Sequence, residues 1–410
     1  MKRRTTLALA LCISCAAWTQ TMKIHSGAVT VAVPVAEAGN MVYGEGGTTL
    51  TVMGKTYAIS DIDSITVDRA VVENNTVQVT YLGEKARVMV AGNIAPQLQL
   101  TVKGADVSAV ADTALQKEIV YTLKGSSVDG TFFMEGDYKA KVILENLALT
   151  HKNGAAIDIA NGKRIDIILP EGTTTTLADG PGTQKACFFV NGHPEFKGGG
   201  TLLLTGNAKH AFASDEYTRF KSDFGTLKVL KAKGDGLHIE QYFKMEGGNI
   251  HIANTGGDGI DVGITKDSTD EYNGQAFIEG GHLTLAVTAD DVKGLKCDSA
   301  LTLSGGTVEA GVSGLGAKGI SVGTHLLIQQ KTEVPTKVIM SVTGTTYKPD
   351  DPEFESKCRG IKAKGDFTFD GGDIQISATG KKSKAISIDG VFHYISGTRN
   401  CEVSTPQGDF

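Results

Sequence analysis

One short pattern recurs along most of this chain and strongly limits what it can fold into. The pattern is a small anchor residue, Gly or Ala, with apolar residues one and three positions after it. The anchors are Ala156, Ala186, Ala211, Gly236, Gly259, Gly294, Gly319, Gly360 and Ala385. Of the eighteen positions at +1 and +3, only Ser214 is neither apolar nor Cys. Because side chains alternate along a strand, both positions face the same way, so each repeat predicts one strand with a buried side.

A glycine pair marks a second strand in many repeats. It occurs in MEGGNIHI (245–252), IEGGHLTL (278–285), LSGGTVEA (303–310) and FDGGDIQI (369–376), with a relative at 196–204. Five of the eight steps between anchors are 23 to 25 residues, and insertions at 263–274 and 325–357 explain the longest. A repeat of this length, with two or more strands and no helical period, predicts an all-β parallel β-helix whose rungs stack about 4.8 Å apart.

The N-terminal part of the chain lacks the anchor. Residues 1–20 combine a basic head, an apolar run and a small-residue exit, which is typical of a secretory signal peptide. We expect cleavage near Thr19 or Gln20, with lipid attachment at Cys15 as the alternative. Residues 21–115 contain alternating strands and are predicted to form an N-terminal β segment, either a separate module or a cap on the first rung. The β-helix itself is predicted to occupy residues 120–400.

Composition limits the kinds of partner that the protein is expected to bind. Removing the leader removes Lys2, Arg3 and Arg4, which leaves 37 basic and 46 acidic residues and a net charge of about −9. Binding to phosphate backbones requires a basic surface, so nucleic acid is not an expected partner. No other apolar stretch reaches the length of a membrane span. We therefore expect a secreted or cell-surface protein without a transmembrane segment, and a monomer.

The position just before each anchor forms a charged column. It reads Ala155, Lys185, His210, Asp235, Asp258, Lys293, Lys318, Arg359 and Lys384, and we expect it to point outward. Asp235 and Asp258 would lie on neighbouring rungs, where two carboxylates need a cation or a shared proton. Lys293 could partly serve, and so could calcium held by Asp235, Asp258, Asp261, Asp290, Asp291 and Asp298. The simpler interpretation is that exposed solenoid turns are charged for solubility.

Basic and aromatic side chains supply the candidate ligand-binding residues. These are Lys293, Lys318, Arg359, Tyr242 and Tyr272. The only Trp, Trp18, lies in the leader, so stacking of neutral sugars on Trp is excluded and a charged stripe favours an acidic glycan such as a uronate polymer. The 9 histidines show no metal-binding spacing. Cys187 and Cys297 are interpreted as apolar fillers of the ladders, whereas the pairing of Cys358 and Cys401 stays open.

Several blocks resemble a known family. The segment 146–180, followed by FKGGGTLLLTGNAKHAFAS, AKGDGLHIEQYFKMEGGNIHIANTGGDGIDV and LTLSGGTVEAGVSGLGAKGI, is similar to secreted bacterial carbohydrate-binding domain-containing proteins. This family is typified by a cellulose- and pectin-binding parallel β-helix. The resemblance covers roughly 120–390 and implies a right-handed β-helix, binding to extracellular polysaccharide and bound calcium. One departure is that the later anchors follow Lys or Arg instead of Asp, so the resemblance implies calcium only in the region of Asp235 and Asp258.

Three functions follow from these patterns. The leading hypothesis is an exported, non-catalytic β-helix that binds an acidic polysaccharide, with or without calcium. The first alternative is a calcium-dependent polysaccharide lyase of the pectate type, in which Lys293 or Lys318 abstracts the C5 proton. The second is a structural surface adhesin with a protein ligand, since solenoid faces also suit that role.

Overall fold

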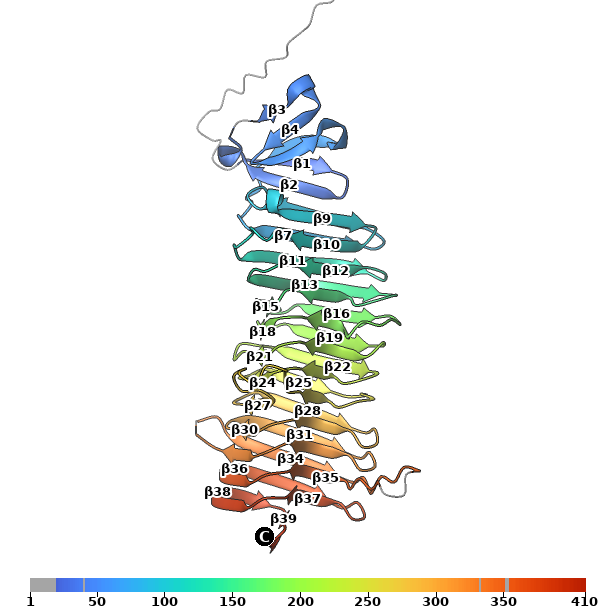
Figure 1. Cartoon of the computed structure of the whole chain (residues 1–410), viewed down its shortest axis with the longest axis vertical. Coiled ribbons are helices and arrows are strands. Elements are labelled where there is room, and N and C mark those ends of the chain that lie inside the picture. The colour runs from blue at the N-terminus through green and yellow to red at the C-terminus, as the bar shows by residue number, and fades with distance from the viewer. Residues whose placement is uncertain (1–19, 40, 332, 351–353) are drawn as a thin grey trace, which may run out of the picture.

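The computed structural model describes residues 20–39, 41–331, 333–350 and 354–410. Residues 1–19 of the predicted signal peptide, Cys15 among them, lie outside these residues. The described chain forms an elongated stack of rungs that runs from the N-terminal end to the C-terminal end along its longest axis (Figure 1). Almost all neighbouring strands of the stack are parallel, so the predicted all-β parallel β-helix is confirmed.

Each full rung contributes one strand to each of three parallel sheets. The anchor sheet contains β9 (Leu98–Lys103), β10 (Asp106–Ala111), β12 (Thr131–Glu135), β14 (Ile157–Ala160), β17 (Ala186–Val190), β20 (His210–Ser214), β23 (Leu237–Ile239), β26 (Ile260–Val262), β29 (Lys293–Cys297), β32 (Lys318–Val322), β35 (Arg359–Ala363), β37 (Lys384–Ile388), β39 (Val403–Thr405) and β40 (Gly408–Asp409). At the two ends of this sheet, β9 pairs antiparallel with β10 and β40 pairs antiparallel with β39. All other pairs in it are parallel.

The second sheet follows the anchor sheet along each rung. It contains β7 (Thr76–Leu82), β11 (Ile119–Ser127), β13 (Ala140–His151), β15 (Arg164–Ile168), β18 (His193–Lys197), β21 (Thr218–Phe220), β24 (Tyr242–Met245), β27 (Gln275–Ile278), β30 (Leu301–Leu303), β33 (Leu326–Gln329), β36 (Phe367–Ala378) and β38 (Phe392–Asn400). The third sheet contains β16 (Thr174–Asp179), β19 (Thr201–Gly206), β22 (Thr226–Ala232), β25 (Asn249–Ile252), β28 (His282–Val287), β31 (Gly306–Val312) and β34 (Thr336–Val342). The long strands β13 and β36 belong to both sheets.

The N-terminal segment adds strands to the first rung, and most of these strands pair antiparallel. Its strands are β1 (Thr21–Ser26), β2 (Val29–Pro34), β6 (Ser64–Asp68) and β8 (Ala86–Ala91), with a small sheet of β3 (Val42–Tyr43), β4 (Thr49–Val52) and β5 (Lys55–Ala58). Short 3-10 turns occupy Val35–Glu37, Glu45–Gly47, Ile59–Asp61 and Ala95–Gln97. Because β7 pairs antiparallel with β8 and parallel with β11, this segment continues directly into the second sheet and covers its first edge.

The register of the anchor sheet follows the predicted ladder with one exception. Leu237, Ile260 and Leu295 pair in sequence, as the +1 column requires. In β17, however, Phe188 and not Cys187 pairs with the +1 residue of the neighbouring rungs, so the predicted anchor at Ala186 is wrong by one residue. Phe189 is therefore half-exposed, and the Lys185 ammonium lies 4.9 Å from its ring centre. The extra residue leaves both Ala186 and Cys187 buried.

Close contact between rungs explains why most anchors are Gly. A Cβ added to Gly259 would lie 2.4 Å from the carbonyl oxygen of Gly294, and one added to Gly236 would lie 2.6 Å from that of Gly259. The second Gly of each pair has a different reason, because it turns the chain from the second sheet into the third. Gly248 and Gly281 have φ of 79° and 83°, in the left-handed region that favours Gly.

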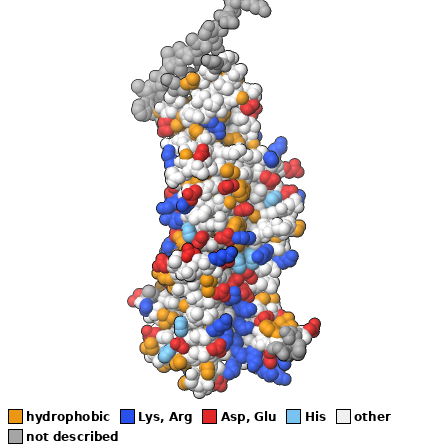
Figure 2. Space-filling view, viewed as in Figure 1, with side chains coloured by type: hydrophobic (Ala, Val, Ile, Leu, Met, Phe, Trp, Pro, Cys, Tyr) orange, Lys and Arg blue, Asp and Glu red, His pale blue; other side chains and the backbone are white. Residues whose placement is uncertain are grey.

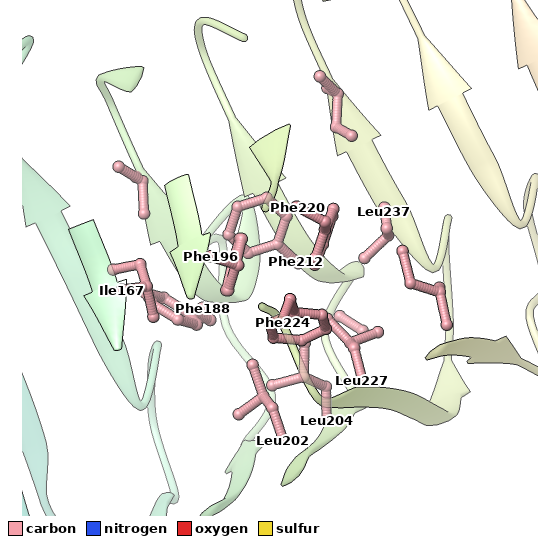
Figure 3. Packing of buried hydrophobic residues seen from close by; sticks show 14 of the residues in the cluster. Ile167, Phe188, Phe196, Leu202, Leu204, Phe212, Phe220, Phe224, Leu227 and Leu237 are labelled. Atoms are coloured by element: carbon pink, nitrogen blue, oxygen red, sulfur yellow. The ribbon is translucent and has the colours of Figure 1, made fainter. Parts of the chain in front are cut away.

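Apolar side chains from the three sheets fill the interior without a break. In the middle rungs the filling is aromatic, as Figure 3 shows for Phe196, Phe212, Phe220 and Phe224. The ring centres of Phe196 and Phe220, from β18 and β21, are 4.7 Å apart with an interplanar angle of 8°. Ser214, the polar exception in the ladder, is buried but satisfied, because its hydroxyl donates to the Glu216 carbonyl oxygen at 2.7 Å. No helix among the described residues is long and apolar enough to cross a membrane.

Candidate functional site

The charged column before the anchors lies at the turn from the third sheet into the anchor sheet. Its basic part is in register, since Lys318 pairs with Lys293 on one side and Arg359 on the other, and Arg359 pairs with Lys384. The column does not simply point outward as predicted. His210 is 4% exposed, Arg359 is 9% exposed, and the side chain of Lys318 is 16% exposed. These side chains fold over the turn and hydrogen-bond to it.

Asp235 and Asp258 lie on neighbouring rungs, as their spacing predicted, and each binds the backbone of the next rung. The Asp258 N–H donates to Asp235 Oδ1 at 2.7 Å, and the Lys293 N–H donates to Asp258 Oδ1 at 2.7 Å. Burial raises the pKa of Asp258 to about 6, against the opposing hydrogen bond from Lys293. The pair thus joins three rungs through backbone hydrogen bonds, a role that needs no metal.

An ionic network surrounds this pair on the outer side of the anchor sheet. His238 and Asp261 are paired residues of β23 and β26. The His238 Nδ1 lies 3.0 Å from Asp235 Oδ2 and 3.3 Å from Asp261 Oδ2. Hydrogen bonds to these two carboxylates raise the pKa of His238 to about 9. Lys296 completes the network with its Nζ 2.8 Å from Asp261 Oδ1.

His210 stands on the neighbouring rung and contacts the same carboxylate. Its Nδ1 lies 3.1 Å from Asp235 Oδ2, and its ring stacks on that of His238 with centres 4.4 Å apart. The sequence interpretation missed this pair because the two histidines occupy different columns, one before an anchor and one two residues after. The signal was the +2 column, in which His238, Asp261 and Lys296 follow one another.

The six carboxylates predicted to hold calcium do not form one site. Asp290 accepts the N–H of Leu315 at 2.8 Å, and Asp291 accepts the hydroxyl of Ser356 at 2.5 Å. Asp298 lies 3.2 Å from the Lys296 ammonium. Around Asp235 and Asp261, imidazoles and an ammonium take the places where calcium requires six to eight oxygens. The residues at this cluster do not fit calcium, and calcium binding elsewhere on the chain stays a prediction.

The basic end of the column borders a cleft. The cleft has a volume of about 440 Å³ and lies between the anchor sheet and the insertion that carries residues 354–357. Its lining residues are Asp291, Lys318, Phe354, Glu355, Ser356, Lys357, Arg359, Lys362 and Ser387. On the face that Figure 2 shows, Lys and Arg side chains gather over the C-terminal rungs beside this insertion. Basic groups thus outnumber acidic ones around the cleft.

The three predicted basic residues of the column all donate to backbone carbonyl oxygens. Lys293 donates to the Asp291 carbonyl oxygen at 2.7 Å, and Lys318 donates to the Gly316 carbonyl oxygen at 2.8 Å. The Arg359 Nη1 donates to the Cys358 carbonyl oxygen at 2.7 Å. Burial lowers the pKa of Lys318 and of Arg359, because carbonyl groups replace only part of the lost hydration. An anion in the cleft would therefore stabilise both cations.

Tyr242 and Tyr272 lie on another part of the surface, at the second sheet. Their ring centres are 5.7 Å apart and nearly perpendicular, while Tyr217 stacks on Tyr242 at 4.7 Å. Tyr242 is half-buried beside the rings of Tyr217, Tyr272 and Phe277, so Tyr272, 46% exposed, is the ring of the pair more open to a ligand. The structure does not bring these tyrosines onto the sheet that carries Lys293, Lys318 and Arg359.

Comparisons with known proteins agree with this architecture. A polysaccharide lyase-like protein from C. thermocellum, solved as a gadolinium derivative, matches with a TM-score of 0.51 and 20% sequence identity. The match covers 62% of this chain and 98% of that chain, and at this identity it shows the fold alone. No curated protein matches the chain. The family model for carbohydrate-binding domain-containing proteins matches residues 103–405, and the chain therefore belongs to that family.

Proposed function

We propose that this protein is an exported, non-catalytic binding protein that holds an acidic polysaccharide at the basic cleft of the anchor sheet. The observation that carries the proposal is the set of cations around the cleft: Lys318, Lys357, Arg359 and Lys362 line about 440 Å³, together with two acidic residues, Asp291 and Glu355. The Lys362 ammonium also pairs with Asp389. Family membership supports a carbohydrate ligand.

The chemistry of the cleft favours a uronate-type chain over a neutral one. Rungs about 4.8 Å apart place Lys318, Arg359 and Lys384 in line, so several carboxylates of one extended chain can be bound together. Arg and Lys donors form charge-assisted hydrogen bonds with carboxylates, which are stronger than those with hydroxyl groups. Phe354, 44% exposed, adds an apolar surface at the edge of the cleft for the ring face of a sugar.

Affinity electrophoresis through gels that contain polygalacturonate tests the proposal. We expect retardation by polygalacturonate that weakens with added salt, and none by a neutral glucan. The double variant Lys357→Glu/Lys362→Glu should lose roughly tenfold or more in affinity, the equivalent of one charged hydrogen bond. The matched control is Lys228→Glu/Lys231→Glu, which makes the same charge change at exposed positions of β22.

Two outcomes would overturn the proposal: no retardation by acidic polysaccharides at low salt, or equal loss in both double variants. Repeating the gels with calcium and with a chelator tests the predicted calcium requirement.

A lyase is the second candidate, and one observation favours it. The pKa of Lys318 is lowered by burial, which is the direction that a general base requires. Within the described residues Lys318 faces one carboxylate, Asp291, 3.4 Å from its ammonium. Ultraviolet absorbance during incubation with polygalacturonate separates the two functions, because only a lyase forms an unsaturated product. A surface adhesin remains the third proposal, and binding to protein but not glycan would favour it.

A further inference from the structure

The pair of stacked histidines converges on carboxylates that come from two different rungs. His210 begins β20, Asp235 precedes β23, His238 lies within β23, and Asp261 lies within β26. One ligand atom each from His210, Asp235 and His238 lies within 4.8 Å of the other two. The nearly parallel rings, at 10°, direct both Nδ1 atoms to Asp235 Oδ2. The rungs therefore assemble a group that no single segment of the chain contains.

The separations match those between the ligands of a small metal ion. Asp235 Oδ2 lies 3.1 Å from His210 Nδ1 and 3.0 Å from His238 Nδ1. Asp261 Oδ2 lies 3.3 Å from His238 Nδ1. Metal–ligand bonds of about 2.0–2.1 Å in a tetrahedron put neighbouring ligands roughly 3.3 Å apart. Small side-chain movements would bring these atoms around one ion.

Protons alone leave the group with an unfavourable contact. The Asp235 N–H donates to His210 Nδ1 at 3.0 Å, so this nitrogen presents a lone pair and no proton. The same nitrogen faces the carboxylate Oδ2 of Asp235, which also has only lone pairs to offer. A cation bound between the two atoms would make this contact favourable. The nitrogen has one lone pair, so the Asp235 N–H would then give up its hydrogen bond to His210 Nδ1.

The other nitrogen of the His210 ring has no competing hydrogen bond among the described residues. This nitrogen, Nε2, is buried. Meanwhile a single His238 N–H is shared between Asp235 Oδ2 and Asp261 Oδ2. One proton therefore serves three atoms that could each bind a cation. The side chain of His238 is 29% exposed, so an ion would reach the site from solvent on this side.

We propose that His210, Asp235 and His238, with Asp261 as fourth ligand, form a binding site for a divalent transition metal of the zinc type. Two imidazole nitrogens with carboxylate oxygens suit zinc, cobalt, nickel or copper, whereas calcium requires an oxygen shell. The site ties together the rungs of β20, β23 and β26 at a position separate from the basic cleft. It is independent of the proposed glycan-binding function, and metal-free protein would keep that function.

Titration of the metal-free, leaderless protein with Co²⁺ tests the site. We expect one equivalent to produce the visible absorption of tetrahedral cobalt, and Zn²⁺ to displace it. Zn²⁺ should also raise the melting temperature, since an ion that binds only the folded state stabilises it. Asp235→Asn and His238→Gln should each weaken binding by roughly 100-fold or more, beyond the loss usual for outer-shell partners. Asp235→Asn keeps an oxygen for the Asp258 N–H and so preserves the turn.

The matched control is His251→Gln. His251 and His282 also sit on adjacent rungs, with ring centres 6.4 Å apart, but Glu309 is the acid beside them. This variant should bind Co²⁺ as the wild type does. Absence of stoichiometric Co²⁺ and Zn²⁺ binding by the folded wild type would overturn the proposal. So would undiminished binding in Asp235→Asn and His238→Gln, each checked for folding by circular dichroism.

Discussion

Asp258 provides a sharp test of whether the acidic turns hold rungs together through the backbone or through calcium. Its Oδ1 accepts the Lys293 N–H at 2.7 Å. Asparagine keeps an oxygen for this hydrogen bond and removes the charge, whereas alanine removes both. The two variants therefore separate the hydrogen bond from the negative charge at one position.

The magnitude follows from the pKa of the carboxyl group. Burial raises that pKa to about 6, compared with about 3.9 in an unfolded chain, and two units correspond to roughly 3 kcal/mol. Since the folded pKa is the higher one, the Asp258 carboxyl contributes most to stability below about pH 4 and loses this contribution as the pH rises through 6. Asp258→Asn should thus be more stable than the wild type by roughly 1–3 kcal/mol at pH 7.5 and not at pH 4.

Alanine should behave differently. It leaves the Lys293 N–H without its acceptor, so Asp258→Ala should be less stable than Asp258→Asn by roughly 1–3 kcal/mol at both pH values. The assay is urea denaturation in the presence of a chelator, repeated with calcium. Equal stability of the two variants would refute the hydrogen-bond argument. Calcium that stabilises the wild type, with both variants losing this gain, would show that the carboxylate holds the ion.

Two further predictions concern the interior of the β-helix. Phe196→Ala should lower the free energy of unfolding by about 3–5 kcal/mol, because its ring is fully buried among other Phe rings. Phe189→Ala, at a half-exposed position, should lower it by only about 1 kcal/mol, and a larger loss for Phe189→Ala than for Phe196→Ala would refute the register of β17. The Cys187 thiol is fully buried and burial raises its pKa well above the usual value, so a thiol reagent should modify half-buried Cys401 first and reach Cys187 only on unfolding; rapid reaction of Cys187 in the folded protein would contradict the structure.

Much of the fold was predictable because it repeats. Alternation of side chains and a step of 23 to 25 residues determine which residues face inward. The tertiary structure of a β-helix then consists mainly of stacking these inward faces on one another. The error at Ala186 shows the limit of this reasoning. An extra buried residue in β17 shifts the strand by one position, and Cys187 and Phe188 are equally plausible inward residues by pattern alone.

The candidate site was only partly predictable. Spacing placed Asp235 beside Asp258 because neighbouring rungs bring equal positions together. It could not show that Lys318 and Arg359 turn back onto carbonyl groups, since a side chain's direction depends on the turn it packs against. Nor could it join His210 to His238, which meet because one rung's turn lies over the next rung's strand. The repeating interior thus follows from the spacing of apolar residues, whereas the polar side chains that meet depend on how each rung packs against the next.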